Sequence, residues 1–276
     1  MKTFTVSENM SLRDFTDSVY PQGSFAFSRL LRDKDIRVNG EKIGKNISLH
    51  SGDGVVYYTS RKEEQKPFYT EIYKDNDILI VDKFSGVNSE ALHFYLDKNF
   101  GAKFIHRLDR NTSGVMAFAL SDRGERELLS AFKEQRAEKI YQAVCVGIFD
   151  KKSAVLSAYL IKNPAAAKVK VCSEPKIGAE KIVTEYRVLE ERGGLSLLEI
   201  RLHSGKTHQI RAHMAFCGHP VLGDEKYGNE EKNAAYRVKR QILVAKSLSF
   251  TFSGELSRLN NKKFVSAFSA EFPSNG

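Results

Sequence analysis

Residues 104–120 read FIHRLDRNTSGVMAFAL and join a charged turn directly to an apolar run that is typical of a buried strand. In the turn, Asp109 stands between Arg107 and Arg110, and residues 112–114 lead into the strand. Nearby positive charge lowers the pKa of a carboxyl group, so we expect these two arginines to keep Asp109 ionised. A charged carboxylate can serve as a nucleophile or as a base. An ordinary turn would use the same residues, and spacing alone favours that simpler interpretation.

Residues 203–228, HSGKTHQIRAHMAFCGHPVLGDEKYG, predict a turn followed by a helix that opens near Thr207. Arg211 lies four residues after Thr207 and therefore falls on the same helical face. Gly218 and Pro220 are expected to end the helix. Arg211 would then point from a rigid helix toward an anion, either an RNA phosphate or a buried carboxylate.

The same segment contains four histidines and a cysteine, so a metal site has to be considered. A zinc-binding helix places two histidines four residues apart, with a glutamate beside the first. His208 and His213 are five apart, which separates them by about 140° around a helix. We therefore expect structural histidines or RNA contacts, and no bound metal.

From Phe68 onward, short β-type segments dominate the chain. Ser121 can cap a helix whose Leu128, Leu129 and Phe132 would face inward. There is no regular βαβ alternation and no glycine-rich phosphate loop. The predicted fold class is α+β, with a mixed, mostly antiparallel sheet and peripheral helices forming a catalytic domain over residues 68–276. The expected strands cover residues 78–81, 114–120, 141–146, 181–189 and 195–202.

Residues 1–60 predict a separate small α+β domain. Two short helices are expected at residues 11–19 and 24–33, separated by the strong breaker Pro21-Gln22-Gly23. Asn39-Gly40 is a signal for a two-residue hairpin. Arginines on the helices beside a tight hairpin would form a platform for phosphates. The charged stretch at residues 61–67, RKEEQKP, ends in proline and is typical of a linker.

The composition is ordinary for a soluble globular protein, with 41% apolar and 28% charged residues among 276. No run approaches the ~18 apolar residues of a membrane-spanning helix, and the N-terminal sequence has no secretory or transit pattern. Three widely spaced cysteines indicate a reducing compartment, so we expect a cytoplasmic protein. The net charge of +9 suits a polyanionic partner, although a merely soluble basic surface explains it equally well.

Several motifs, in order along residues 68–270, resemble those of the RluA-type pseudouridine synthases. The catalytic motif of that family is similar to His106-Arg107-Leu108-Asp109 together with Thr112-Ser113-Gly114. Residues 138–143 (EKIYQA) are similar to the segment that bears its active-site tyrosine. Residues 207–213 (THQIRAH) resemble its late basic motif. Separately, residues 27–58 resemble a small RNA-binding module named after a ribosomal small-subunit protein, here called S-four-like.

The resemblance implies isomerisation of selected uridines to pseudouridine in structured RNA, without a cofactor. Asp109 would be the nucleophile, Tyr141 would lie against the target base, and Arg211 would pair with Asp109. Arg107 would help to displace the uridine, because a stacked base cannot be reached until its nucleotide is flipped. Further substrate contacts are expected from His106, Arg110, Thr112 and His208, and RNA contacts of the N-terminal module from Arg29, Arg32, Arg37 and Asn39.

The N-terminal module accompanies ribosomal members of the family, which favours large-subunit ribosomal RNA as the substrate; we also expect a monomer. The alternatives are transfer RNA as the substrate, a non-catalytic role in RNA binding or ribosome assembly, and a metal-assisted hydrolase. Two departures from the family's motifs bear on substrate identity. Phe84-Ser85-Gly86 follows Lys83 where the family usually has proline and alanine, and residues 203–206 (HSGK) replace a commoner Thr-Gly-Arg form.

Overall fold

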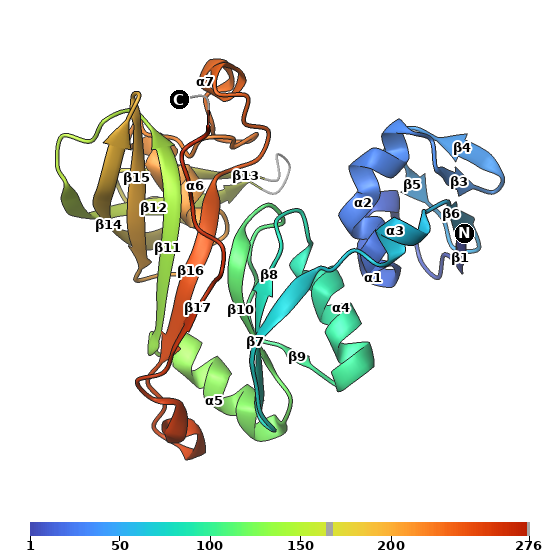
Figure 1. Ribbon diagram of the computed structural model, residues 1–276, viewed down its shortest axis with the longest axis horizontal. Helices are drawn as coiled ribbons and strands as arrows, with labels where there is room; N and C mark the ends of the chain where they lie inside the picture. The colour runs from blue at the N-terminus through green and yellow to red at the C-terminus, as the bar shows by residue number, and fades with distance from the viewer. Residues whose placement is uncertain (164–167, 275–276) are drawn as a thin grey trace.

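The computed structural model describes residues 1–163 and 168–274, which form two parts (Figure 1). A four-stranded sheet and two helices make up most of the N-terminal unit (residues 1–60), and an eleven-stranded sheet forms the centre of the rest. The elements of the N-terminal unit are β1 (Lys2–Thr5), β2 (Met10–Ser11), α1 (Leu12–Val19), α2 (Pro21–Arg32), β3 (Ile36–Val38), β4 (Glu41–Ile43), β5 (Ser48–Leu49) and β6 (Gly54–Tyr57).

Both helices expected in the N-terminal unit are present, but the second begins earlier than predicted. α1 follows Ser11, whose hydroxyl oxygen accepts a hydrogen bond from Asp14 N at 3.1 Å, as an N-cap residue does. α2 begins at Pro21, so the expected break over residues 21–23 is wrong. Proline is accepted in the first turn of a helix because the N–H that it lacks would have no helical partner there.

The predicted hairpin at Asn39-Gly40 is confirmed. Asn39 and Gly40 join β3 to β4 with φ of 50° and 88°, the left-handed values that a two-residue turn of this type requires. The Asn39 side chain also donates to Asp53 Oδ1 at 2.9 Å and accepts from Gly54 N at 2.8 Å. Asn39 therefore holds two turns of the unit together.

The segment 61–67, expected as a linker, starts with the short helix α3 (Arg61–Glu64). Ser60 and Glu63 form a capping box at its first turn. Gln22 in α2 donates to the carbonyl oxygens of Glu64 and Lys66 at 2.8 and 2.9 Å. The connection is thus attached to the N-terminal unit along part of its length.

The large sheet confirms a mixed, mostly antiparallel α+β fold. Its strands follow the order β13-β12-β14-β15-β11-β16-β10-β8-β7, while β9 and β17 pair with β10 and β16. β10 runs parallel to β16, and the other neighbouring pairs run antiparallel. The strands are β7 (Tyr69–Lys74), β8 (Ile78–Lys83), β9 (Lys103–Phe104), β10 (Ser113–Ala119), β11 (Ala137–Val146), β12 (Ser153–Asn163), β13 (Lys168–Cys172), β14 (Glu180–Arg192), β15 (Leu195–Leu202), β16 (Leu243–Phe250) and β17 (Lys263–Val265).

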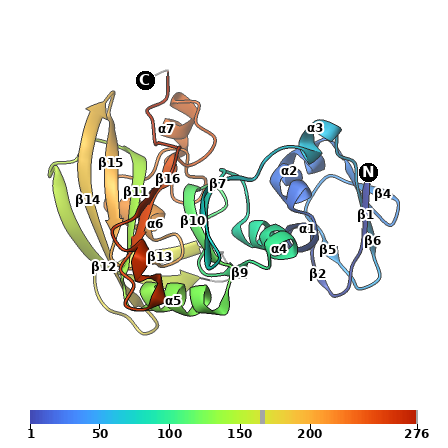
Figure 2. The same cartoon turned by 60° about the horizontal axis from the view of Figure 1, so that its bottom comes forward.

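The remaining helices lie around this sheet. Figure 2 shows α4 between the sheet and the N-terminal unit, and α1 and α2 pack against α4. Within the residues that the structure describes, no helix is both long and apolar enough to cross a membrane. The helices are α4 (Ser89–Phe100), α5 (Asp122–Lys133), α6 (Gln209–Phe216), α7 (Glu230–Ala235) and the 3-10 helix η1 (Glu255–Leu259).

The strand that follows the Asp109 motif is buried along its whole length, as predicted. At its start, Gly114 has φ of 117°, and a Cβ atom built there would lie 2.2 Å from the carbonyl oxygen of Ala245 in β16. Glycine alone permits so close an approach in this conformation. The beginning of β10 is therefore held directly against β16.

Ser121 caps α5 as predicted, because its hydroxyl oxygen accepts a hydrogen bond from Gly124 N at 3.0 Å. Leu128 is buried and Phe132 is half-buried against the core. Leu129 was expected to face inward but is 44% exposed. Neighbouring residues of a helix point about 100° apart, so Leu128 and Leu129 cannot both face the sheet.

Candidate active site

Asp109 lies in the Asp109 turn (residues 109–112), which immediately precedes β10. Thr112 N donates to Asp109 O at 3.0 Å. The fully buried Lys83, at the end of β8, reaches the same turn, with its Nζ 3.3 Å from Asp109 O and 3.1 Å from Arg110 O. These contacts hold the main chain of the turn from the side of β8. Burial lowers the pKa of Lys83 to about 7.

Arg211, on α6, joins Asp109 to a second carboxylate. Its Nη1 donates to Asp109 Oδ2 at 2.8 Å, and its Nε and Nη2 donate to Asp224 at 2.7 and 2.9 Å. Only 7% of the Arg211 side chain is exposed. Burial alone would lower the pKa of Arg211, but the two carboxylates raise it overall. Of the two anions expected for Arg211, the structure shows the buried carboxylate, in a geometry that a planar guanidinium suits.

The expectation that Arg107 and Arg110 hold Asp109 is wrong. Arg107 is 63% exposed, and its Nη1 lies 2.7 Å from Glu90 Oε1 in α4. Arg110 turns the other way and pairs with an aspartate of α1. Side chains of successive turn residues point in different directions, so proximity in sequence does not bring these guanidinium groups to Asp109. The cation beside it is Arg211, from a distant part of the chain.

A pocket of about 290 Å³ opens beside Asp109. Asp109 reaches it from the turn, Arg211 from α6 and Tyr141 from β11. Arg110 was expected to contact the substrate but does not line this pocket. Apolar walls with a few polar groups are typical of sites for small ligands. The other predicted substrate residues that line it are His106, Arg107, Thr112 and His208, and its apolar lining comprises Leu108, Phe132, Leu202, Ile210 and Leu243.

Tyr141 lines the pocket from β11 near Asp109. Burial raises the pKa of Tyr141, and the charge of Asp109 raises it further. The phenol is therefore protonated at neutral pH. Lys139 lies two residues earlier, on the same face of the strand, and also lines the pocket. Burial lowers the pKa of Lys139.

His106 and Thr112 are fixed in the pocket wall by hydrogen bonds. His106 Nε2 accepts from Ala117 N at 3.0 Å, and burial lowers the pKa of His106 to about 3. Its ring is therefore neutral at physiological pH. Gln241 Nε2 donates to Thr112 Oγ1 at 2.8 Å. These contacts favour a rigid wall over mobile substrate ligands.

His208 sits at the start of α6 and faces Asp109. Its left-handed φ of 54° explains why the helix begins at Gln209 rather than near Thr207. His208 Nδ1 lies 2.9 Å from Tyr227 Oη, and Nε2 lies 3.9 Å from Asp109 Oδ1. Burial lowers the pKa of His208, while the charge of Asp109 opposes that shift.

The other histidines of the late segment contact separate partners. His203 Nε2 lies 2.8 Å from Glu185 Oε2. His213 Nδ1 lies 3.0 Å from Thr184 Oγ1, and His219 Nδ1 lies 3.0 Å from a main-chain oxygen at the end of β11. The proximity of these residues in sequence therefore reflects three different structural roles.

A model of the RNA pseudouridylate synthase family matches residues 72–216, a range that includes the Asp109 turn, β11 and α6. A protein of Aquifex aeolicus, named "Uncharacterized RNA pseudouridine synthase", is 32% identical over 249 residues, which cover 80% of this chain and 78% of that protein. The chain belongs to the RNA pseudouridylate synthase family. It is an RNA pseudouridine synthase, as the resemblance of its motifs to the RluA-type enzymes predicted.

Two further comparisons agree with this assignment. "Ribosomal large subunit pseudouridine synthase C" of Vibrio cholerae is 28% identical to this synthase and covers 84% of its chain and 81% of the relative's own length. The solved structure of "Human RNA Pseudouridylate Synthase Domain Containing 1" is 28% identical, with a TM-score of 0.59 over 67% of this chain and 79% of that one. The fold and the sequence thus identify the same family.

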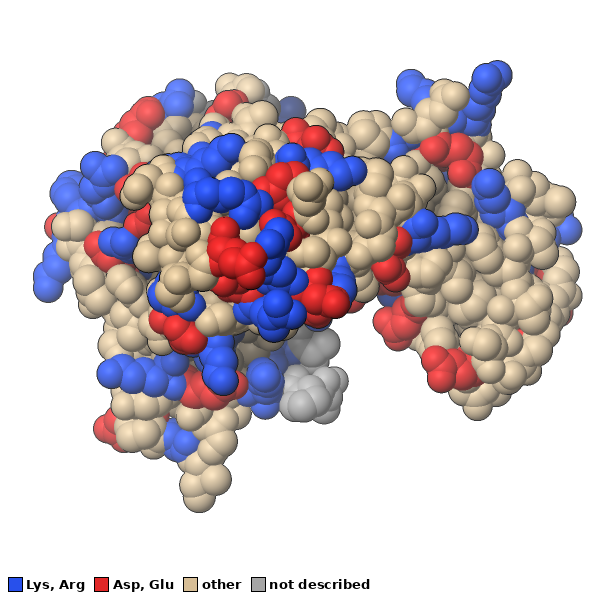
Figure 3. All heavy atoms as spheres, turned by 90° about the horizontal axis from the view of Figure 1, so that it is seen from below, with Lys and Arg blue, Asp and Glu red and all other residues tan. Residues whose placement is uncertain are grey.

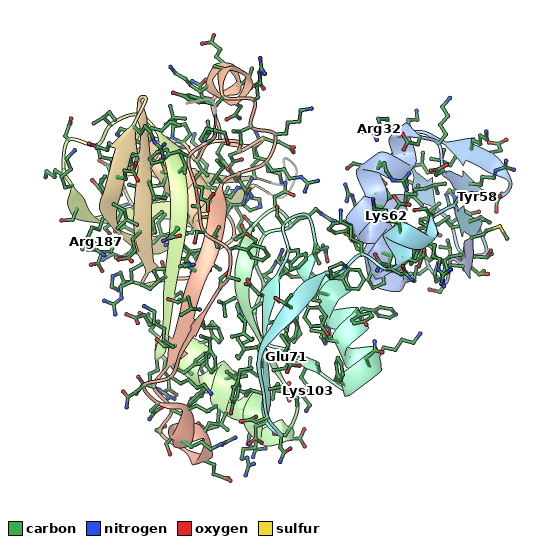
Figure 4. The ribbon with its side chains drawn as sticks, in the orientation of Figure 1. Arg32, Tyr58, Lys62, Glu71, Lys103 and Arg187 are labelled. Carbon is green, nitrogen blue, oxygen red and sulfur yellow. The ribbon has the colours of Figure 1, made fainter. Side chains whose placement is uncertain are left out.

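The predicted RNA-binding residues of the N-terminal unit differ in their availability. Arg29 pairs with Asp33, Asp35 and Glu63 and so holds α2 to its surroundings. Arg32 is 74% exposed. Figure 4 shows Arg32 and Tyr58 on the N-terminal unit, away from the large sheet on which Arg187 lies. The guanidinium of Arg37 lies 5.5 Å from the centre of the Tyr58 ring, and Asn39 supports turns, as described above.

Charge alone does not mark a path for RNA on the face shown in Figure 3. On the face shown in Figure 3, basic and acidic side chains are interspersed over the large domain rather than gathered into one basic surface.

Sequence reasoning missed two residues that hold the site, Asp224 and Lys83. Asp224 stands in the motif GDEKYG, shortly after α6, but nothing in that pattern shows that it meets Arg211. Lys83 was considered only as the residue that precedes Phe84-Ser85-Gly86. The available signal was its place two residues after the apolar run 78–81, since an ammonium buried there needs several acceptors. The structure supplies them as main-chain carbonyls.

Proposed function

We propose that this synthase isomerises selected uridines of large-subunit ribosomal RNA, with Asp109 as the nucleophile. The observation that carries the proposal is the position of Asp109, held by Arg211 in the wall of a pocket that Tyr141 also lines. The Vibrio cholerae relative is named for the ribosomal large subunit, which supports the choice of RNA.

The target base has to leave its helix before it can reach Asp109, because a stacked uracil is shielded by its neighbours. Arg107 is placed for this step, since it lines the pocket and is also largely exposed. The side chain of its partner Glu90 is half-exposed, and ion pairs that water reaches contribute little stability. The guanidinium can therefore leave Glu90 and stack in the space that the flipped nucleotide vacates.

Asp109 then starts the reaction as an anion, since an arginine beside a carboxylate favours its charged form. The bond between C1′ and N1 breaks, the uracil turns, and a bond forms between C1′ and C5. C5 loses its proton and N1 gains one, so the reaction is redox-neutral and needs no cofactor. Tyr141 packs against the detached base and keeps it in the pocket. His106, Thr112 and His208 shape the walls around it.

The N-terminal unit is proposed to bind RNA as an S-four-like module. Arg32 and Arg37 are the side chains best placed to meet phosphates, while Arg29 and Asn39 maintain the shape of the unit. We further propose, in line with the sequence analysis, that the enzyme acts as a monomer in the cytoplasm. Size-exclusion chromatography with light scattering tests the monomer.

The test of the reaction uses transcripts labelled with tritium at C5 of uridine. The wild-type enzyme should release tritium from a large-subunit ribosomal RNA transcript, with or without a chelator, whereas Asp109→Asn should release none. Release from transfer RNA but not from ribosomal RNA would overturn the proposed substrate. No release from either RNA, with binding retained, would instead indicate a non-catalytic RNA-binding protein.

A further inference from the structure

One side chain of the Asp109 turn contacts the N-terminal unit. The turn itself belongs to the catalytic part, which comprises the large sheet and the helices around it. Arg110 forms an ion pair with Asp17 of α1, and its Nη1 lies 3.3 Å from Oγ and 3.4 Å from O of Ser24 in α2. Ser24 Oγ also donates to Asp17, so the three residues form one network. The residue next to Asp109 is thereby bonded to both helices of the N-terminal unit.

This network lies within a packed interface. The Asp17 side chain is 11% exposed and that of Arg110 is 26% exposed. α1 and α2 pack against α4 beside it, and Phe25 of α2 packs against the apolar cluster that contains Leu79 and Val81 of β8. Charges removed from water need well-formed partners, and loss of one partner is costly. The Asp17–Arg110 ion pair is therefore a fixed contact between the two parts.

The main chain of the same turn is held from the opposite side. Lys83 Nζ donates to Arg110 O at 3.1 Å, and Gly86 N donates to the same oxygen at 2.9 Å. Ser85 Oγ donates to Asn111 O at 3.0 Å. The catalytic part thus fixes the main chain of the turn, and the N-terminal unit fixes its Arg110 side chain. A rotation of the turn would break both sets of contacts and move Asp109 away from Arg211.

We propose that Asp17 is a positioning residue, through which the N-terminal unit holds the Asp109 turn in the conformation that places Asp109 against Arg211. The inference rests on the proposed role of Asp109. It gives the N-terminal unit a task besides contact with RNA. Loss of the Asp17–Arg110 ion pair then slows the chemical step at saturating RNA, while the exposed arginines of the unit continue to bind.

The first experiment measures single-turnover rates of full-length Asp17→Asn, Arg110→Gln and the double variant over a range of RNA concentrations. Each single variant should lower the saturating rate about tenfold, since small displacements of a catalytic group have effects of this size or larger. The RNA concentration at half-maximal rate should change less than about twofold. The double variant should be no slower than the slower single variant, because both changes remove one interaction. Asp14→Asn, an exposed carboxylate on the same helix, should retain the wild-type rate.

A second readout needs neither RNA nor activity. Amide hydrogen exchange of residues 109–113 should be faster in Asp17→Asn than in the wild type or in Asp14→Asn, with melting curves confirming that each variant is folded. The proposal is overturned if the variants lose only RNA affinity, if the two single effects multiply in the double variant, or if exchange is unchanged. A wild-type enzyme without tritium release would refute the proposed function alone, since exchange would still test the contact.

Discussion

Replacement of Asp224 by asparagine tests how far the site depends on a residue outside the pocket lining. Asp224 is enclosed, accepts two hydrogen bonds from Arg211, and also accepts from the main-chain N–H groups of Lys226 and Tyr227 at 2.8 and 3.1 Å. Asparagine has nearly the same shape, but it removes the charge and presents an NH2 group where Arg211 needs an acceptor. Arg211 then keeps Asp109 as its ion-pair partner but loses the contact that sets its direction.

The magnitude follows from burial. Removal of one partner from a buried ion pair costs about 3–5 kcal/mol, and both Arg211 and Asp224 are buried here. A chain of this length loses roughly 2–4 °C in Tm for each kcal/mol. We therefore expect Asp224→Asn to lower Tm by about 10 °C. The saturating rate should fall about a hundredfold, because Asp109 and Arg211 no longer keep their geometry.

The assay combines thermal unfolding with single-turnover tritium release at a temperature well below the Tm of the variant. Asp122→Asn is the matched control, since it removes the same charge from an exposed ion pair with Lys103. Its Tm and its rate should stay close to those of the wild type. Equal Tm and equal rate for Asp224→Asn and Asp122→Asn would refute the reasoning, because Arg211 would then not need its second carboxylate.

Two further predictions concern acid stability and RNA binding. The pKa of Asp77 is lowered to about 2, chiefly by Arg123 and also by Ser121 and Arg258. A carboxyl group whose pKa is lower in the folded state stabilises the fold above about pH 4, and this contribution is lost as pH falls toward about 2. Asp77→Asn should therefore destabilise the protein less at pH 3 than at pH 7 in urea unfolding, and equal losses would contradict this. Arg37→Gln should lower the slope of log affinity against log salt by about one; an unchanged slope would show that Arg37 meets no phosphate.

The parts of the fold that could be predicted have local causes. Asn39-Gly40 forms a hairpin because of its own conformational preferences. Ser121 caps α5 because its hydroxyl reaches an N–H group three residues away. The apolar run after Asp109 is buried in the middle of the sheet. The catalytic family also follows from residues that occur in short, ordered motifs.

Other features depend on contacts that no local pattern contains. Arg107 and Arg110 flank Asp109 in sequence, yet the carboxylate is held by Arg211, because tertiary packing decides where each side chain points. Asp224 meets Arg211 only because α6 and the following loop fold back on each other. Positions such as these could be identified only once the sheet had brought the segments together.

The parallel pairing of β10 with β16 has a consequence for when the active site can form during synthesis of the chain. Ser113 pairs with Val244 and Gly114 with Ala245, so β10 lacks this neighbouring strand until residues 243–250 have left the ribosome. Segments so distant in sequence find each other slowly, because a long loop must close before the new contacts can offset its lost entropy. The nascent chain therefore carries Asp109 without a complete site until β16 has been made and has paired with β10.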